Sequence, residues 1–506
     1  MSCSSTFSKT TCLWASSGSL NVSASFASLI LSVAHRVSAS LQLLDDPAFP
    51  RDKASYRKYL SDPARFRQVV TIEDASVLAK IHHTYRLHYL KDVVLARILE
   101  DATFSILQSI IFFYQVEIVN YCGGNEQFLS SLFSIFREDK KATLDEEEKQ
   151  RKRDGVLFLQ QLCTMGKTIQ LPSRITLYHT LVERGLLDVI EFAFLDGDSG
   201  LRNAAAEMLM LIIEYDANSV RLHVLSQKEK KVKSLMSTLI ELLHHDGDMG
   251  LKSQIVEVMR ILLDCGDSSS NMANQAMVQQ QFLGSKITPK ADPEQFLTIF
   301  YEEDATLLLS PMKSLPDVAS LKKLSKLPPM TLSESALYGH LCDLLCFINT
   351  CHAFRSQYFV ITSEVSKKVA ALLRSRDKHV RCAAVRFFRS CLANNNQFTN
   401  RHHIKMDLFD VLLDIVEEEA DKDNLVASAC MNYFDYMRKE NMKPLINDIA
   451  AKYRPRLVKL AAHKTAGKTF EDLLQKSDRG SAATHAGNLS VDSKASAQSI
   501  EEQQRM

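Results

Sequence analysis

The sequence predicts an all-α protein built from stacked helical repeats, with disordered tails at both ends. Three observations lead to this fold class. The chain has only 16 glycines and 12 prolines among 506 residues, which disfavours a turn-rich β fold. Apolar residues recur at three- and four-residue spacing from about residue 41 to about residue 463, as in amphipathic helices, and no strand-like alternation of useful length interrupts them. Finally, one helical pattern returns several times along the chain.

The two ends of the chain differ in composition from the rest. Residues 1–40 contain thirteen serines and no acidic residue, and we expect a segment that is disordered or wrongly predicted. Lys9 and Arg36 are its only basic residues apart from histidine, too few for an organellar transit peptide, and a secretory signal would need a shorter, more basic start. Residues 464–506 are polar and poor in aromatics, so they are predicted to be a disordered tail.

The predicted repeat domain covers residues 41–463 and has two interruptions. The charge-dense run of residues 137–153 is typical of a solvated helix end or loop. The stretch from about 265 to 333 carries the loop signals GDSSSNMANQ and KLPPM, and we interpret it as an irregular insert.

The repeated pattern starts with a turn and ends in a run of apolar residues. Residues 198–215 read DSGLRNAAAEMLMLIIEY, and similar segments start at residues 248, 377 and 423. Their first apolar residues are Leu201, Leu251, Val380 and Leu425, separated by 50, 129 and 45 residues, and 129 is close to three periods of 43. Armadillo and HEAT repeats have periods of about 40–47 residues, so we predict an armadillo/HEAT-like α-solenoid. Chance similarity among amphipathic helices is the alternative.

The residue types in this repeated segment suit a helix that must pack against neighbouring helices. The leading acids, Asp198, Asp248, Asp377 and Asp423, are expected to cap the free N–H groups at a helix start. Small residues such as Ala204 allow another helix to approach closely, and the apolar face that follows requires the next repeat to cover it. Three copies then place a cation after the first apolar residue: Arg202, Lys252 and Arg381. A structural ladder with acidic neighbours is the favoured interpretation of these cations, and partner binding is the alternative.

Motifs for catalysis, cofactors or metals are missing from the sequence. The run AHKTAGKT at 462–469 lacks the first glycine of a phosphate-binding loop and follows a helix where such a loop needs a strand. Adjacent histidines, as in residues 82–83, 244–245 and 402–403, point about 100° apart on a helix and are poorly placed to share a metal, so we expect surface or cap positions. We therefore predict no catalytic, cofactor-binding or metal-binding residues.

Charge and cysteine usage narrow the class of partner. The 61 basic and 60 acidic residues nearly cancel, so no global field favours nucleic acid or an anionic membrane. The basic and aromatic run of residues 51–67 could touch phosphates, but its interleaved acids and helical spacing favour packing. Residues 104–119 are too polar and too short to span a bilayer and are predicted to be a buried core helix.

Eleven cysteines without paired spacing indicate a reducing, intracellular compartment.

Several longer runs resemble one known family. Residues 66–74 (FRQVVTIED) and 80–95 (KIHHTYRLHYLKDVVL) resemble the regulatory subunit 3 family of protein phosphatase 4, also called the Suppressor-of-Mek family. The similarity continues through residues 110–119, 181–209, 292–301 and 380–412, and it covers about residues 43–460.

This resemblance implies a function as well as a fold. Members are non-catalytic regulatory and scaffolding subunits with an armadillo-like domain, and they join the phosphatase 4 catalytic subunit and regulatory subunit 2. The resemblance thus implies these two partners, phosphoprotein substrates, a nuclear and cytoplasmic location and a link to the DNA damage response. The sequence fits this division of labour, because GDMG at 247–250 and GNE at 124–126 lack the histidines of metallophosphatase motifs.

The chain also departs from the family pattern. Members normally begin with a pleckstrin-like EVH1 domain that docks proline-containing peptides, and the Ser-rich segment stands there instead. We expect a chain without that domain, which we attribute to a fragmentary gene prediction.

Two other functions stay open at this stage. An importin-like or other helical-repeat adaptor is less favoured, because such proteins present a tryptophan ladder and Trp14 is the only tryptophan here. An enzyme with an unfamiliar solenoid active site is the third possibility.

Overall fold

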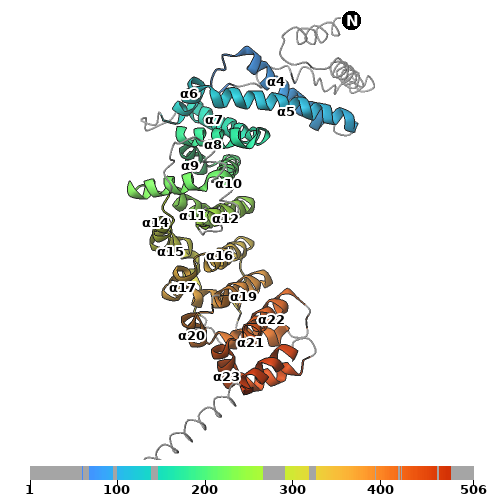
Figure 1. Ribbon diagram of the computed structural model, residues 1–506, viewed down its shortest axis with the longest axis vertical. Helices are drawn as coiled ribbons and strands as arrows, with labels where there is room; N and C mark the ends of the chain where they lie inside the picture. The colour runs from blue at the N-terminus through green and yellow to red at the C-terminus, as the bar shows by residue number, and fades with distance from the viewer. Residues whose placement is uncertain are drawn as a thin grey trace, which may run out of the picture. The chain divides into compact units, whose positions relative to one another are not determined.

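The computed structural model (Figure 1) consists of helices and connecting turns throughout its described part. It describes residues 60, 68–94, 100–137, 146–265, 291–317, 326–393, 395–419, 422, 424–463 and 467–479. The predicted all-α class is confirmed. The Ser-rich segment, most of residues 51–67 and the end of the predicted tail lie outside the described residues. The chain divides into two compact units, residues 1–211 with 278–284, and residues 212–277 with 285–506.

The first unit starts with a capped helix and continues through short helical hairpins. Its elements are α4 (Ala75–Tyr89), the π-helix η2 (Leu90–Val94), α5 (Asp101–Gly124), α6 (Glu126–Arg137), α7 (Glu146–Met165), the 3₁₀-helix η3 (Gly166–Thr168), α8 (Leu171–Arg184), α9 (Leu186–Phe194) and the part of α10 (Ser199–Glu229) up to Leu211. Asp74 caps α4 by accepting from the N–H groups of Ser76 and Val77. Gly185 joins α8 to α9 at a φ of 108°, a conformation that favours glycine.

Helix α5 corrects the prediction of a buried core helix. Its buried residues, such as Leu107, Ile111 and Ile118, form one face. Phe104, Phe112 and Phe113 are 44%, 42% and 58% exposed on the rest of its surface. Among the described residues α5 is the one helix whose length and composition are sufficient to cross a membrane, a criterion that core helices also meet. The prediction that no membrane is involved stays a prediction.

The charge-dense run is partly helical. Arg137 ends α6, and the portion from Glu146 onward forms the first turns of α7. Lys152 is fully buried there, and its Nζ lies 5.7 Å from the centre of the Phe192 ring. Arg153 pairs with Asp196 at 3.1 Å. The prediction of a solvated helix end therefore holds for most of these residues. Lys152 is the exception, because the aliphatic stem of a lysine can pack against apolar neighbours.

The second unit holds the repeats most clearly. Its elements are the rest of α10, α11 (Leu235–His245), α12 (Met249–Leu263), α14 (Pro293–Ile299), the π-helix η4 (Phe300–Asp304), α15 (Ala305–Leu308), the 3₁₀-helix η5 (Ser310–Ser314), α16 (Leu332–Cys351), α17 (Ala353–Thr362), α18 (Val365–Leu372), α19 (Lys378–Ala393), α20 (Gln397–Lys405), α21 (Leu408–Glu419), α22 (Leu425–Lys439), α23 (Lys443–Ala461) and a last helix over residues 467–479. Helices α12, α16, α19 and α22 pack in succession, and α17–α18–α19 and α20–α21–α22 form three-helix repeats of the armadillo kind (Figure 1).

The predicted caps are present in three of the four copies. The side chains of Asp198, Asp248 and Asp377 each accept a hydrogen bond from the N–H two residues later, at 2.8–2.9 Å. In the fourth copy Asn424 caps α22, and Asp423 lies outside the described residues. The alignment of that copy is also wrong by one residue, because Val426 is fully buried whereas Leu425 is 71% exposed.

Two further expectations about the repeats need correction. Helix α16 packs against both α12 and α19, so one helix lies between those two copies where three periods of 43 required two. The predicted irregular insert, about 265–333, contains α14, η4, α15 and η5. Phe296, Phe300 and Met312 of these elements are buried, which the loop signals on either side concealed.

The domain also ends later than residue 463. Residues 467–479 form a helix in which Phe470 and Leu473 are fully buried. The ring of Phe470 lies 5.2 Å from that of Phe434 in α22, and Asp472 accepts from Arg438 at 3.1 Å. Phe470 and Leu473 are three residues apart and share one face of the helix, and the neighbouring Leu474 is half-buried.

The C-terminal end of α12 is held by side chains from two other segments. The guanidinium of Arg221 on α10 donates to the carbonyls of Ile261, Leu262 and Asp264 at 2.9–3.0 Å. His352, between α16 and α17, donates from Nε2 to the carbonyl of Leu263 at 2.7 Å. The last carbonyls of a helix have no partner within it, so these donors satisfy groups that would otherwise be buried unpaired.

Candidate protein-binding surface

The three cations predicted from the repeats lie in the first turns of α10, α12 and α19. Arg202 donates to the carbonyl of Asp196 at 2.8 Å. Lys252 is 1% exposed, and its Nζ lies 3.5 Å from the His244 carbonyl and 3.4 Å from Ser333 Oγ. Burial lowers the pKa of Lys252. Each of these two cations therefore reaches back toward the helix before its own.

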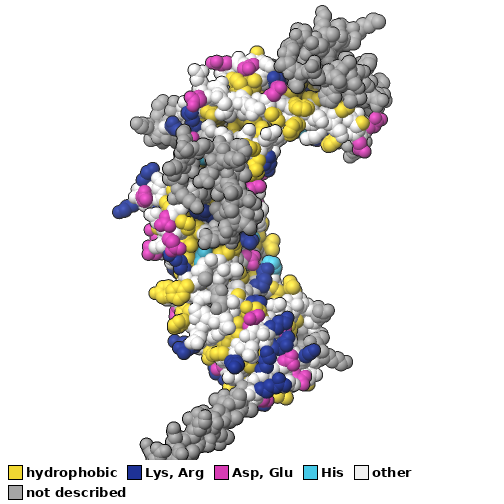
Figure 2. Space-filling model, in the orientation of Figure 1, with side chains coloured by type: hydrophobic (Ala, Val, Ile, Leu, Met, Phe, Trp, Pro, Cys, Tyr) yellow, Lys and Arg dark blue, Asp and Glu magenta, His cyan; other side chains and the backbone are white. Residues whose placement is uncertain are grey.

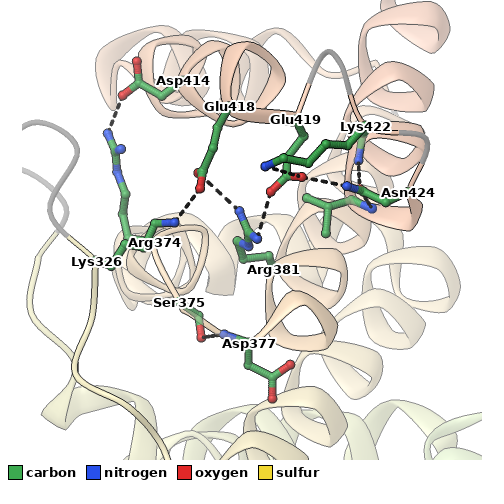
Figure 3. A network of polar contacts seen from close by, with 12 residues as sticks. Lys326, Arg374, Ser375, Asp377, Arg381, Asp414, Glu418, Glu419, Lys422 and Asn424 are labelled. Carbon is green, nitrogen blue, oxygen red and sulfur yellow. Dashed lines mark hydrogen bonds and ion pairs between the residues drawn. The ribbon is translucent and has the colours of Figure 1, made fainter.

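Arg381 belongs to an extended ion-pair network (Figure 3). Its guanidinium pairs with Glu418 at 3.5 Å and Glu419 at 3.2 Å, both on α21. Burial alone would raise the pKa of Glu419, but hydrogen bonds from Asn424 and Lys422 and the charge of Arg381 outweigh it and lower the pKa. The network thus ties α19 to α21.

The acidic face of α21 continues this network away from Arg381. Arg374 pairs with Asp414 at 2.7 Å (Figure 3), and Arg456 of α23 pairs with the same carboxylate at 2.7 Å. Arg456 also contacts Asp410 and Glu417. Cations from before and after α21 therefore neutralise its carboxylates, which is a structural arrangement.

These contacts favour the ladder interpretation of the three predicted cations. Each cation serves its own repeat; Arg202 belongs to the first unit, and Lys252 and Arg381 belong to the second. Lys252 and Arg381 are almost fully buried. A partner-binding role for Arg202, Lys252 and Arg381 stays a prediction.

A different set of side chains forms a partly exposed row across the helices that pack in succession. We call it the second-helix row. Its members are Arg260 of α12, Asp343 and Phe347 of α16, Arg386 and Arg389 of α19, and Asn432 and Tyr436 of α22. Members on one helix are three or four residues apart and so share a face of that helix.

Contacts link the row from one helix to the next. The guanidinium of Arg260 lies 5.3 Å from the centre of the Phe347 ring. Arg386 pairs with Asp343 at 3.1 Å. Arg389 lies 3.2 Å from the centre of the Tyr436 ring and donates to Asn432 at 3.3 Å. Cation–π and ion-pair contacts therefore alternate along the row.

The row combines the residue types that protein interfaces favour. The side chains of Arg260, Asp343 and Arg386 are 46%, 44% and 54% exposed, so their pairs are solvated and worth only about 0–1 kcal/mol each. Arginine and aromatic residues are enriched at binding hot spots, and weak surface pairs can be exchanged for pairs with a partner. Figure 2 shows lysine and arginine side chains gathered in the region of α19 and α22.

Sequence reasoning missed this row because its aromatics look like core residues. Phe347 stands in an apolar run, and its half-exposed position depends on how α12 and α16 pack. One signal was available, since Arg386 and Arg389 flank the buried Phe387 and Phe388 in VRFFRS and must share the opposite face of α19.

A metal site and a reactive thiol each place specific requirements on the described residues. No group of three or more His, Cys, Asp or Glu side chains among them is placed to hold a metal ion. Burial raises the pKa of the Cys163 and Cys391 thiols to about 12, which disfavours the nucleophilic thiolate. The histidine expectation is wrong for His403, which is buried and lies 5.7 Å from the Phe388 ring.

Comparison with solved structures does not help to assign the fold. Two engineered proteins match 63% and 87% of the chain at 15% and 13% identity. Their TM-scores of 0.35 and 0.34 are too low to carry an argument.

Comparison with known sequences is far more informative. The chain is 34% identical over 445 residues to an uncharacterised protein of Schizosaccharomyces pombe, covering 85% of this chain and 50% of that protein. It is 27% identical to Suppressor of Mek1 of Dictyostelium discoideum, covering 85% and 39%. It is also 27% identical to serine/threonine-protein phosphatase 4 regulatory subunit 3 of Drosophila melanogaster, covering 79% and 38%.

These matches show which family the chain belongs to and how much of its relatives it covers. The chain spans half or less of the length of the relatives it matches. The family described as phosphatase 4 regulatory subunit 3 matches residues 43–479, which end with the last described helix. Its members are regulatory and not catalytic subunits. The chain therefore belongs to the phosphatase 4 regulatory subunit 3 family.

Proposed function

We propose that this chain holds the catalytic subunit of protein phosphatase 4, together with regulatory subunit 2, and directs it to phosphoprotein substrates. Family membership over residues 43–479 is the observation that carries the proposal. A repeat array suits this role, because stacked repeats present long continuous surfaces to partners. The nucleus and cytoplasm, and a link to the DNA damage response, are parts of the same proposal.

The second-helix row is the surface that we propose for the phosphatase partners. It runs over four helices that pack in succession, and Arg260 and Arg389 lie over aromatic rings. A partner could replace the solvated Asp343 as counter-ion of Arg386, at little cost to the folded chain. Buried cations such as Lys252 and Arg381 hold the repeats together instead.

Co-purification tests this function directly. Tagged chain should recover the phosphatase 4 catalytic subunit, identified by mass spectrometry, and recovery should fall strongly with the double variant Arg386→Glu and Arg389→Glu. Lys313→Glu, an exposed charge reversal in η5 away from the row, is the matched control. Absence of the catalytic subunit from the wild-type sample would refute the function. Equal recovery with the row variant would refute only the surface.

A further inference from the structure

The three most exposed aromatic side chains of the described residues lie on two neighbouring helices. Phe354 and Tyr358 of α17 are 70% and 65% exposed, and Phe398 of α20 is 66% exposed. Helices α17 and α20 contact each other. These three residues form what we call the aromatic patch, on the first helices of two consecutive three-helix repeats and apart from the second-helix row.

The burial pattern indicates that both helices turn the same face outward. Ser356, Gln357 and Val360 face the interior from α17, and Thr399, Asn400 and His403 do so from α20. The two sets have the same spacing and lie 43 residues apart, so the helices occupy equivalent orientations in their repeats.

A hydrogen bond fixes the two helices side by side. Asn396, the cap of α20, donates from its side-chain amide to Gln357 Oε1 of α17 at 2.6 Å. Gln357 directly precedes Tyr358, and Asn396 is two residues from Phe398. Figure 2 shows apolar side chains gathered over α17 on the visible face.

The exposed area is large for a patch with no partner. Aromatic side chains bury about 150–250 Å² each, so three that are two-thirds exposed leave roughly 300–500 Å² in water. That area equals the largest apolar patch on a typical monomer, and such patches often mark binding sites.

The charged side chains on the two helices of the patch have a single sign. Helices α17 and α20 contain no aspartate or glutamate, whereas they carry Arg355, Arg401 and Lys405. Arg401 is three residues from Phe398 and Lys405 is seven, so both follow the exposed face of α20. Arg355 pairs with Glu294 on α14 and donates to Thr298 at 3.1 Å. The patch is therefore aromatic with a basic border.

We propose that the aromatic patch docks a short acidic segment of a partner protein, in which aromatic or aliphatic side chains alternate with Asp and Glu. The apolar side chains of the segment cover Phe354, Tyr358 and Phe398, and its carboxylates pair with Arg401 and Lys405. Anchors of this kind at helical or extended spacing are a common way for helical surfaces to recognise peptides. Single-stranded nucleic acid could also stack on aromatics, but it needs a longer track of cations than these two helices supply.

Peptide binding to the full chain tests this proposal without any phosphatase. A fluorescent peptide of about ten residues, alternating Glu with Phe or Leu, is titrated with protein and followed by anisotropy. We expect binding that a matched peptide with Lys in place of Glu, or Ala in place of Phe and Leu, does not show. Higher salt should weaken it, because the carboxylate contacts are exposed.

Variants then locate the binding on the patch. Phe354→Ala with Phe398→Ala should weaken binding by at least about tenfold, as for interface anchors. Arg401→Glu should weaken the binding of the acidic peptide and strengthen the binding of the lysine peptide. The matched controls are Leu195→Ala, which removes an exposed apolar side chain elsewhere, and Lys378→Glu, an exposed charge reversal on α19.

Each outcome of these experiments either supports or overturns the proposed peptide binding. Because all substituted side chains are exposed, unchanged circular dichroism should accompany them. Failure of the acidic peptide to bind, equal binding of the lysine peptide, or binding that survives the patch variants would overturn the proposal. Binding of a single-stranded oligonucleotide that the patch variants abolish would assign the patch to nucleic acid instead.

Discussion

Acid should destabilise the second unit through His403, a buried histidine of α20. Its ring packs against Phe388, and burial lowers its pKa from 6.5 to about 3. Its Nδ1 is buried with no hydrogen-bond partner among the described residues. A neutral ring is therefore required in the folded chain, whereas the unfolded chain is free to bind a proton. We expect the substitution His403→Phe to remove this acid sensitivity.

The sign and size of the effect follow from proton linkage. Between pH 6.5 and about 3 the unfolded state binds one more proton at this site than the folded state. The free energy of unfolding therefore falls as pH decreases, by about 1.4 kcal/mol per pH unit below 6.5. At about pH 5 the loss amounts to roughly 2 kcal/mol, and above pH 6.5 the site contributes no slope.

Urea unfolding at several pH values measures this slope. The wild-type chain should lose stability below pH 6.5 more steeply than His403→Phe, by about 1.4 kcal/mol per unit. The slope is compared within each protein, so any packing cost of the larger ring does not affect it. His379→Phe, at an exposed histidine, is the control for the substitution itself. Identical slopes for wild type and His403→Phe would refute the reasoning.

Three further substitutions or truncations test the packing of the repeats. Arg381→Met should destabilise the second unit by about 3–5 kcal/mol, because Glu419 stays buried with fewer cations; adding Glu419→Gln should recover part of this loss in a double-mutant cycle of thermal unfolding. Arg221→Met should cost about 3 kcal/mol or more by leaving carbonyls of α12 unpaired, and hydrogen exchange at the end of α12 should then quicken. Truncation after residue 463 should lower the melting temperature and expose Phe434 to quenching or protease, whereas truncation after 479 should not.

The fold was largely predictable because its signals are local. A capping acid such as Asp248, followed by apolar residues at helical spacing, identifies a helix start from a few residues alone. The class of repeat and the approximate period followed from four such helices. Caps are interchangeable, however, and the fourth copy uses Asn424, so an alignment on acids and first apolar residues slipped by one position there.

The positions that failed depend on contacts between distant segments. Phe470, Leu473 and Leu474 are the only apolar residues among residues 467–479, and only the contact of Phe470 with Phe434 of α22 shows that a helix docks there. A structural role for Lys252 and Arg381 was the favoured interpretation from the sequence, but their near-complete burial depends on contacts with the preceding helix and with α21. The second-helix row and the aromatic patch need two or more helices side by side, and no single helix pattern contains that information.

The joint at the end of α12 determines how the second unit should respond to force. In a simple solenoid each repeat touches only its neighbours, so the array can lose repeats one at a time from an end. Here Arg221 of α10 and His352 beyond α16 hold adjacent carbonyls of one helix. Because pulling either segment away leaves carbonyls of the same helix end without their donors, we expect the region from α10 to α16 to yield as one elastic block. A single large force step in optical-tweezers stretching, with no smaller steps before it, would be the signature of such a block.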